Sequence, residues 1–526
     1  MSRVIGIDLG TTYSCLAHLQ GDAPKVIPNL EGTTTTPSMI SFTSGGEVLV
    51  GNLAMRQALT NPEKTIYAVK RLVGRKFQSP EITEARKRLP YKLAEAANGD
   101  VLIEAGPRVI TPQEASALIL KYLKKCAESF FSEDVTECVI TVPAHFNDHQ
   151  RQATKDAASI AGLQVTRIIN EPTAASLAYG LNQRKNGLVA VYDLGGGTFD
   201  ITLLEISGGV FHVLATDGDT YLGGEDFDQR IIDWLVSEFR TENNIDLSPD
   251  KYAFQRIKEA AERAKRDLSF TAEVEINLPF IAAGPFGSKH LRKTLTRAFL
   301  EQLTGDLVER TVPLMEKVLA DSGLAVSQVD DVILVGGQSR MPLVRRRIAA
   351  FFGRAPNTQV NPDESVALGA AIQSAILEGE ALEDLILLLD VTSLSLGIET
   401  ENDGMEILIP KNSTIPCRKA KTFTTVEDNQ RRVRIHVRQG EFPKASENIS
   451  LSVFDLVGLI PAQAGVPQII VTFEIDANGM VKVSAKDAAS GREQMISVRP
   501  SSGLSKQQVD SIIERNQTRE PRGTRA

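Results

Sequence analysis

The chain has 526 residues, and its 58 Lys plus Arg against 66 Asp plus Glu give a net charge of −8. This acidic balance argues against a generic nucleic-acid binder, which usually carries a basic excess. The hydrophobic share of 42% and the charged share of 24% exclude global disorder, and the length predicts roughly three to four domains' worth of chain.

The cysteine content and the N-terminus indicate a reducing compartment. Cys15, Cys126, Cys138 and Cys417 include no C-x-x-C pair, and four cysteines are too few for a disulfide framework in so long a chain. The first residues lead straight into an apolar strand, without the apolar core of a signal peptide. No stretch approaches the ~18–20 apolar residues that cross a bilayer. We therefore expect a cytoplasmic protein without a nucleic-acid or membrane partner.

The first 380 residues alternate short β-rich runs with amphipathic helical runs, which is typical of α/β layers. The clearest strands are Val4–Ile7, Cys138–Val142, Val189–Tyr192 and Val332–Val335, and the clearest helices are Asp148–Ile160 and Met341–Phe352.

One pattern occurs twice in this region. Ile7–Thr12 and Tyr192–Thr198 each join an apolar strand, an Asp, a Gly-rich turn, a Thr and a second strand. Each copy is followed later by a strand, a turn and a helix that lead to a Pro beside acidic residues, which suits a helix N-terminus. We predict two related lobes, residues 1–182 and 183–378.

The pattern of apolar and polar residues changes after residue 378. Residues 379–390 combine an acidic stretch with the apolar run Leu385–Leu389 and form a candidate linker. Alternating runs such as Val433–Arg438 and Ile469–Ile475, separated by turn residues, predict a half-buried antiparallel sheet domain at 391–500. Residues 501–526 predict a short helix over Leu504–Arg515 and a frayed polar tail.

The paired Asp-Gly turns indicate phosphate and metal chemistry. Glycine lets backbone N–H groups approach phosphate oxygens, and an Asp at the strand end suits Mg²⁺, usually through water. One such turn is typical of an ordinary hairpin, but two copies favour nucleotide binding. No Walker motif and no strand-borne G-x-G-x-x-G is present. The Gly223-Gly224 and Gly336-Gly337 pairs either approach a ligand or only punctuate turns.

The sequence resembles the seventy-kilodalton heat-shock chaperone family, the bacterial DnaK-type in particular, over nearly the whole chain. The segments that carry the resemblance are Gly6–Thr12, Asp193–Asp200, Leu222–Asp228, Val335–Pro342 and Asp390–Gly397. It implies an α/β actin-like two-lobed ATPase domain that holds Mg-ATP or ADP with a monovalent cation such as K⁺. An antiparallel β-sandwich peptide-binding domain then follows.

The resemblance also implies the roles of individual residues in the nucleotide site. Asp8 and Asp193 position Mg²⁺ and its waters, Lys70 reaches the γ-phosphate, and Glu171 and Thr198 place the attacking water with Asp200 nearby. Without the motif match, Lys70 alone is typical of a solvated surface lysine. The remaining nucleotide-binding positions are Gly10, Thr11, Thr12, Tyr13, Gly195, Gly196, Gly197, Gly223, Gly224, Glu262, Lys265, Arg266, Ser269, Gly336, Gly337, Arg340 and Asp363.

A third set of positions matches the family's communication between domains and its contacts with a J-domain co-chaperone. The same residue types also occur as ordinary helix-surface charge. The set is Pro143, Arg151, Arg167, Asn170, Leu387, Leu388 and Asp390, together with Glu171. The apolar pattern of residues 385–389 predicts a buried strand. The resemblance instead implies an interdomain linker that adds to a sheet as an edge strand.

The β domain is expected to bind extended or unfolded polypeptides in a groove. The matching positions are Leu396, Ile398, Phe423, Val433, Ile435 and Ile469, with Glu401 and Val426 in an arch over the peptide; plain sheet core is the alternative. An apolar residue is common at the position of Glu401, so its carboxylate either weakens the arch or favours basic peptides.

The chain ends where the family continues with a long helical lid, so we expect fast peptide exchange, with a nucleotide exchange factor as a further partner. His145 and His149 lie four apart, but we interpret them as surface histidines and not as metal ligands. Two rival functions remain open. One is a small-molecule kinase on the same scaffold, and the other is a holdase that binds ATP but hardly hydrolyses it.

Overall fold

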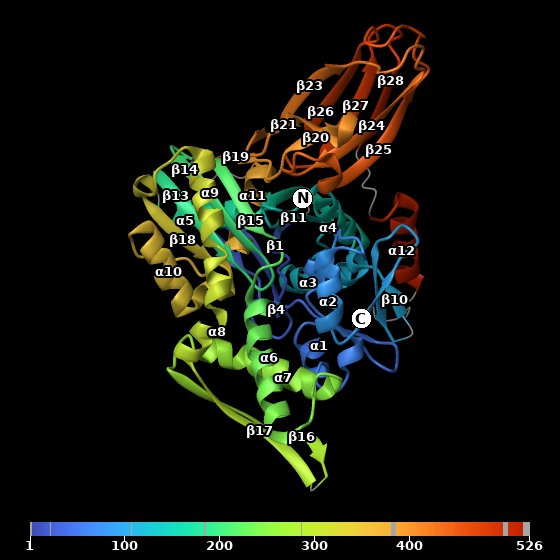
Figure 1. The fold of residues 1–526 in the computed structure, drawn as a ribbon. Coiled ribbons are helices and arrows are strands. Elements are labelled where there is room, and N and C mark those ends of the chain that lie inside the picture. The colour runs from blue at the N-terminus through green and yellow to red at the C-terminus, as the bar shows by residue number, and fades with distance from the viewer. Residues whose placement is uncertain are drawn as a thin grey trace.

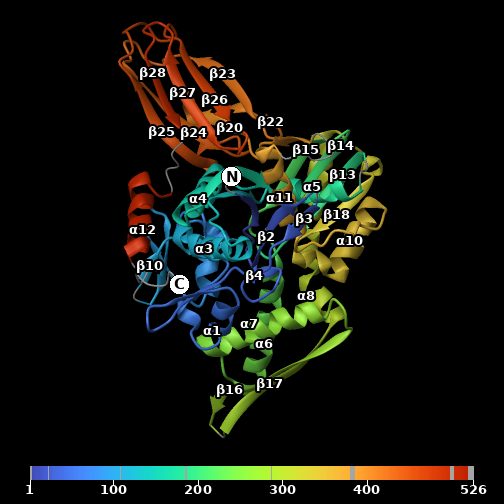
Figure 2. The same ribbon diagram turned by 180° about the vertical axis from the view of Figure 1, so that it is seen from behind.

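The computed structural model describes residues 3–21, 23–106, 108–183, 186–285, 287–379, 386–497 and 503–518. Two α/β units, residues 3–183 and 186–379, are followed by a β unit, residues 386–497, and by one last helix (Figure 1). The β unit stands against one end of the α/β units, and the view from behind shows the same arrangement (Figure 2).

The first α/β unit is built on a mixed sheet with the order β12-β11-β1-β2-β3, and β4 pairs with β2. The central strands are buried on both faces, which explains their unbroken apolar runs. The antiparallel pairing of β1 with β2 sets Asp8 opposite Cys15 beside a tight turn. The strands are β1 (Val4–Asp8), β2 (Tyr13–Gln20), β3 (Ala23–Val26), β4 (Thr35–Pro37), β11 (Glu137–Val142) and β12 (Gln164–Asn170).

The helices of this unit begin at side-chain caps. In α3, Thr111 and Glu114 form a reciprocal capping box, and in α4, Asn147 and Gln150 do the same. The prediction of a helix over Asp148–Ile160 is confirmed. The other elements are α1 (Asn52–Gln57), η1 (Pro62–Lys64), η2 (Val69–Arg71), α2 (Pro80–Arg88), α3 (Pro112–Phe131), α4 (Asp148–Ile160), α5 (Glu171–Gln183), β5 (Ile40–Phe42), β6 (Val48–Val50), β7 (Thr65–Ile66), β8 (Lys92–Glu95), β9 (Val101–Ala105) and β10 (Arg108–Ile110).

The second α/β unit repeats the hairpin of the first. Strands β13 and β14 pair antiparallel with Asp193 opposite Asp200, and β18 lies parallel to β13. The sheet order is β18-β13-β14-β15-β19-β22. The elements up to residue 379 are β13 (Gly187–Leu194), β14 (Phe199–Ser207), β15 (Val210–Asp219), α6 (Gly224–Asn243), α7 (Lys251–Asp267), β16 (Glu273–Gly284), β17 (Gly287–Thr296), α8 (Arg297–Glu309), α9 (Val312–Ser322), η3 (Val326–Gln328), β18 (Asp331–Val335), η4 (Gly337–Arg340), α10 (Pro342–Phe352) and α11 (Ser365–Glu378).

Helices α5 and α11 pack against each other between the two sheets. An added Cβ at Gly369 of α11 would lie 1.7 Å from the carbonyl oxygen of Ala174 in α5. One at Gly6 of β1 would lie 2.3 Å from the backbone nitrogen of Ala371 in α11. Helix α11 therefore contacts the sheet of the first unit, although the sequence pattern groups it with the second.

The β unit consists of two antiparallel sheets with the orders β21-β20-β24-β25 and β23-β26-β27-β28. Their inward side chains share one apolar core, in which Leu396, Ile409 and Phe473 are fully buried. Residues 386–497 contain no α-helix, as the alternating pattern predicts. The elements are β20 (Leu396–Glu399), η5 (Glu401–Asp403), β21 (Met405–Ile409), β23 (Cys417–Phe423), β24 (Arg432–Gln439), η6 (Ala445–Glu447), β25 (Ile449–Val457), β26 (Ile469–Ile475), β27 (Val481–Asp487) and β28 (Glu493–Ser497).

The apolar run before the β unit joins the sheet of the second α/β unit. Strand β19 (Leu387–Val391) lies parallel to β15, with Leu387 opposite Val210. Among the described residues of the apolar run, Leu387–Leu389 pair on one side only, as the edge-strand expectation has it. Strand β22 (Thr414–Ile415) pairs further along, with Asp390 and Val391 on the outer side. Residues 380–385, including Leu385, lie outside the described residues.

The last helix, α12 (Lys506–Thr518), packs against the first α/β unit. Ile512 is buried in the core of that unit, and Val509 and Ile513 contact its edge. The Gly503 N–H donates to Asp100, and Arg515 forms an ion pair with Glu114. The helix predicted over Leu504–Arg515 is confirmed, and the predicted tail 519–526 lies outside the described residues. Among the described helices, none has the length and apolar character needed to cross a membrane.

Candidate functional site

The two Asp-Gly turns face each other across the junction of the α/β units. An added Cβ at Gly196 would lie 2.0 Å from Oγ1 of Thr12, and one at Gly197 would lie 2.6 Å from the side chain of Thr11. Only glycine allows this approach. The two copies of the pattern thus form a single site.

A cavity of about 420 Å³ opens between these turns, a volume in the range of small-molecule and cofactor sites. Twenty predicted site residues line it: Asp8, Gly10, Thr11, Thr12, Tyr13, Lys70, Glu171, Asp193, Gly195, Gly196, Thr198, Gly224, Glu262, Lys265, Arg266, Ser269, Gly336, Gly337, Arg340 and Asp363.

Three predicted residues stand behind the wall of the cavity. Asp200 is buried and accepts hydrogen bonds from the backbone N–H groups of Ala144 and His145, at 3.2 Å each. Gly223 packs on the Gly-rich turn, because an added Cβ there would lie 2.5 Å from the nitrogen of Gly197. Asp200, Gly197 and Gly223 thus shape the turns without lining the cavity.

One end of the cavity holds a buried ion pair. Lys70 Nζ and Glu171 Oε1 lie 2.5 Å apart, and each side chain is 9% exposed. Burial opposes the charge on Lys70, but the neighbouring Glu171 and Asp8 carboxylates outweigh it and raise the pKa of the lysine. Lys70 therefore stays protonated, and its burial excludes the solvated surface lysine that its local sequence suggests.

The carboxylates beside this pair suit a divalent cation. Burial and the negative charge of Glu171 raise the pKa of Asp8 to about 7, and the same two causes raise the pKa of Asp193 well above its ordinary value. The positive charge of Lys70 offsets these two causes only in part, so further positive charge would stabilise the ionised carboxylates. Mg²⁺ prefers oxygen ligands and retains waters, so Asp8 and Asp193 fit the predicted cation site.

The other end of the cavity is formed by the end of α7 and by η4. Lys265 is held by Asp228 at 2.9 Å and by the carbonyl oxygen of Gly224 at 2.9 Å. Arg340 lies across from them and pairs with Asp363 at 2.6 Å. Gly336, the N-cap residue of η4, has φ 77°, a left-handed conformation that favours glycine.

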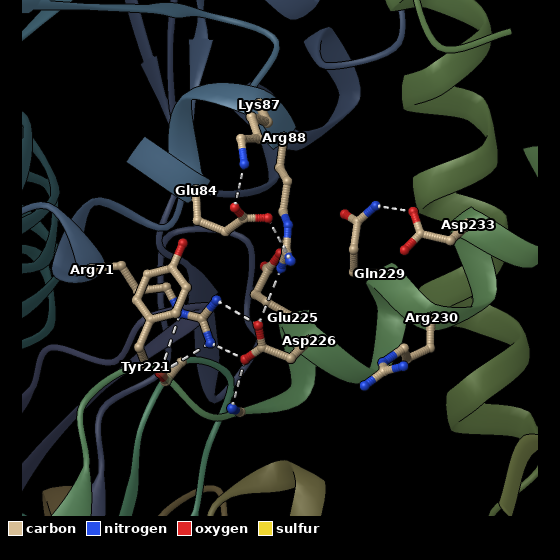
Figure 3. A network of polar contacts seen from close by, with 12 residues as sticks. Arg71, Glu84, Lys87, Arg88, Tyr221, Glu225, Asp226, Gln229, Arg230 and Asp233 are labelled. Atoms are coloured by element: carbon tan, nitrogen blue, oxygen red, sulfur yellow. Dashed lines mark hydrogen bonds and ion pairs between the residues drawn. The ribbon is translucent and has the colours of Figure 1, made fainter. Parts of the chain in front are cut away.

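Arg71, next to Lys70 in η2, ties the two α/β units together beside the site (Figure 3). Its guanidinium donates to the carbonyl oxygen of Gly197 at 3.2 and 3.1 Å, lies 2.5 Å from Asp226 Oδ2 and stacks on the ring of Tyr221. Arg88 of α2 reaches Asp226 at 3.4 Å. The backbone segment that carries Lys70 is thereby fixed to the second Gly-rich turn.

Sequence reasoning missed several residues of this site. Asp226 lies inside the motif segment Leu222–Asp228, and Arg71 directly follows Lys70, but no sequence signal pairs the two residues, which are 155 positions apart. The missed lining residues are Thr35, Glu225, Asp228, Phe270, Val335, Gln338, Pro362 and Val366.

A comparison with protein families agrees with this geometry. The model of the family described as Hsp70 protein matches residues 4–524. This chain belongs to the Hsp70 family. Hsp70 proteins are ATP-binding chaperones that use nucleotide with Mg²⁺ and generally bind unfolded peptides and co-chaperones. The mixed α/β sheets and the two β sheets fit this membership.

In this Hsp70-family chain, most of the residues predicted for domain communication lie at one seam. Asp390 of β19 accepts hydrogen bonds from Asn170 at 3.0 Å and from Thr173 at 3.1 Å. Arg151 in turn donates to Asn170 Oδ1 at 2.6 Å. Pro143 is buried near this group, and Arg167 lies on β12, where burial lowers the pKa of its guanidinium.

The β unit contacts both α/β units around this seam. Asp148 and Ile168 bond to Val481 and Asn478, at 2.9 and 3.0 Å. Lys411 forms an ion pair with Asp217 of β15. The surface assignment of the two histidines is wrong for His149, which is 6% exposed with Nε2 3.0 Å from the carbonyl oxygen of Ser450. Burial lowers the pKa of His145 to about 4.

The predicted peptide-binding positions divide by burial. Leu396, Ile398, Ile435 and Ile469 are buried in the core of the β unit, while Phe423 and Val433 are partly buried against it. The two arch positions are exposed, with Glu401 in η5 and Val426 at 58% exposure. The first four positions thus serve as sheet core in this arrangement, which was the alternative to the groove.

Proposed function

We propose that this chain is an ATPase whose hydrolysis of ATP switches the affinity of the β unit for extended apolar segments of unfolded proteins. The observation that carries the proposal is the cavity where two Asp-Gly turns meet beside the buried Lys70–Glu171 pair. Family membership supports it, because Hsp70 proteins are ATPases and chaperones.

The shape and charge of the cavity support one orientation of the nucleotide. The Gly-rich turns offer backbone N–H groups at the end near Lys70, which suits phosphates. The opposite end, between α7 and η4, offers Lys265, Arg266, Ser269 and Arg340 to the ribose and base.

Hydrolysis then depends on positioning and on charge. Mg²⁺, held through water by Asp8 and Asp193, would neutralise phosphate charge when bound. Glu171 and Thr198 orient a water toward the γ-phosphorus, whose bond to the bridging oxygen breaks to leave ADP and phosphate. Lys70 stabilises the charge that spreads over the γ-oxygens. We assign a K⁺-like monovalent cation to the same carboxylates.

Coupling to the β unit runs through Asp390 and strand β19. Asp390 bonds to Asn170, which directly precedes Glu171 in the sequence. A movement of Glu171 on hydrolysis would therefore reach β19 through one residue. The same seam carries the proposed contacts of a J-domain co-chaperone at Arg167, Asn170 and Asp390.

Fast peptide exchange is part of the proposal. Among the described residues, the one helix after β28 is α12, and it packs on the first α/β unit instead of the β unit. Residues 503–518 therefore do not cover the exposed arch positions Glu401 and Val426 in this arrangement.

The rival functions predict different products. A small-molecule kinase needs an acceptor between the lobes, and a holdase needs a damaged catalytic site. The intact Lys70–Glu171 pair and the two antiparallel sheets disfavour both.

Steady-state phosphate release, measured with and without an unfolded peptide and a J-domain protein, tests the proposal. Stimulation by both additions is the expected result. Phosphorylation of an added sugar would instead identify a kinase, and ATP binding without turnover would identify a holdase. A nucleotide exchange factor should speed ADP release.

A further inference from the structure

Phe270 lies at the mouth of the nucleotide cavity with its side chain in water. It is one of the residues that line the cavity, and it is 82% exposed. Among the described residues, its ring makes no aromatic or cation–π contact, whereas Phe280 meets His290 edge to face and Phe130 contacts Phe131 in the same way. What sets Phe270 apart from other exposed rings is its place in the cavity lining, where a ligand in the cavity would cover the ring and gain free energy by removing it from water.

The backbone under Phe270 is held rigidly. Its N–H donates to the carbonyl oxygen of Asp267 at 2.9 Å, which continues the end of α7. Arg297 clamps the segment from the other side, because its guanidinium donates to the carbonyl oxygens of Leu268 at 2.8 Å and Thr271 at 2.6 Å. Its own N–H donates to the carbonyl oxygen of Ala272 at 2.8 Å. A ring on such a segment is preorganised, which lowers the entropy cost of binding.

The surroundings of Phe270 select the chemistry of its ligand. Arg266 and Arg340 lie on the same end of the cavity, and each already has an oxygen partner, Tyr13 at 3.5 Å and Asp363 at 2.6 Å. The phosphate-binding turns and the Lys70–Glu171 pair lie at the other end. A ligand that spans the cavity from the turns therefore places its other end beside Phe270. A flat, weakly polar group such as a nucleobase suits that position.

We propose that Phe270 stacks on the base of the bound nucleotide and makes this chain select nucleotides by the area of their base. The inference rests on the proposed nucleotide site. It assigns Phe270 a role that the glycine turns and Lys70 cannot supply, because those groups face the phosphates and do not depend on the base.

The experiment measures the dissociation constants of Mg-ADP and of Mg-pyrophosphate, which lacks the base, by calorimetry. Loss of one base–aromatic stack should weaken ADP binding by about five- to tenfold in Phe270→Ser. Pyrophosphate affinity should stay unchanged. Phe270→Trp should keep ADP affinity within about twofold, since its ring also stacks. The loss for UDP should be smaller than for ADP, because a pyrimidine offers less area.

The matched control is Phe280→Ser, which removes another exposed ring, 70% exposed on the β16–β17 hairpin and outside the cavity lining. It should leave both affinities unchanged. Equal ADP affinity in Phe270→Ser and the parent chain overturns the inference. So does an equal loss for ADP and pyrophosphate, which would mean a distorted cavity. A lower sedimentation coefficient of Phe270→Ser with unchanged ADP affinity would mean that a second copy of the chain covers the ring. That result also overturns the inference. If the parent chain fails to bind ADP at all, the proposed function fails with it.

Discussion

Asp148 of helix α4 accepts a hydrogen bond from the backbone N–H of Val481, which lies 333 positions further along the chain. The distance is 2.9 Å, and the second carboxylate oxygen is buried without a hydrogen-bond partner among the described residues. Burial raises the pKa of Asp148 to about 7, which the Val481 N–H and Arg151 only partly offset. The seam between the first α/β unit and the β unit therefore contains a carboxyl group that titrates near neutral pH.

Docking of the β unit should weaken as the pH rises. Because the folded pKa lies above the ordinary value of 3.8, the contribution of Asp148 is complete below about pH 4 and is lost as the pH passes about 7. Hydrogen exchange at the Val481 amide, corrected for its intrinsic rate, should show falling protection between these limits. Asp148→Asn keeps the acceptor without the charge and should flatten the profile. An unchanged profile in this variant would refute the assignment.

Loss of the Lys70 charge should separate binding from hydrolysis. Lys70→Met leaves Glu171 buried without its cation, and removal of one preorganised charge should slow single-turnover hydrolysis by about 10²–10³. ATP affinity should change much less, because the glycine turns remain. Lys76→Met, at a partly exposed pair with Asp100, is the control and should leave the rate within about twofold. Near-parental hydrolysis in Lys70→Met would remove Lys70 from the mechanism.

The contact between the two turns should tolerate no side chain at Gly196. Gly196→Ala sets a Cβ 2.0 Å from Thr12 Oγ1, so the turns must separate, and ADP affinity should fall by at least about tenfold. Gly305→Ala in α8 meets nothing within 4 Å and should raise the free energy of unfolding by up to about 1 kcal/mol. Calorimetric titration with Mg-ADP measures the affinity of both variants, and denaturant unfolding measures the stability of Gly305→Ala. Parental affinity in Gly196→Ala would mean that the turns do not close on the ligand together.

The docking of α12 should depend on one buried side chain. Ile512→Asp places a carboxylate at a position that is 7% exposed in the core of the first α/β unit, at a cost of about 2–4 kcal/mol. Limited proteolysis should then cut within 503–518 much faster. Ser511→Asp, on the exposed face of the same helix, should not change the rate. Equal cleavage of the two variants would show that this helix does not rest on Ile512.

The carboxylate at Glu401 should set the preference of the arch for peptide charge. Glu401→Met removes an exposed negative charge in η5, and peptides with basic residues should lose about threefold to tenfold in affinity while apolar peptides gain. Fluorescence anisotropy with a matched pair of labelled peptides measures the difference. If the parent chain and Glu401→Met bind the basic peptide with equal affinity, and likewise the apolar peptide, this prediction is wrong.

Local sequence patterns predicted much of the nucleotide site. Strand periodicity and turn chemistry act over a few residues, so the hairpins at Asp8 and Asp193 and the helix Asp148–Ile160 could be placed before any tertiary contact was known. The positions of Lys70 and of the α7 residues came from the resemblance, since their local sequence is typical of solvated surface.

How distant segments meet follows from tertiary packing and not from local pattern. Helix α11 crosses to the sheet of the first unit because Gly369 and Gly6 allow backbones to touch, and no local periodicity reports that contact. His149 is buried for the same reason: its neighbour Ser450 is 301 positions away. Local sequence pattern alone predicted two Asp-Gly turns and a change from helical to alternating pattern. Packing alone shows which side chains those turns enclose. It also shows that Phe270 lies uncovered at the mouth of the cavity.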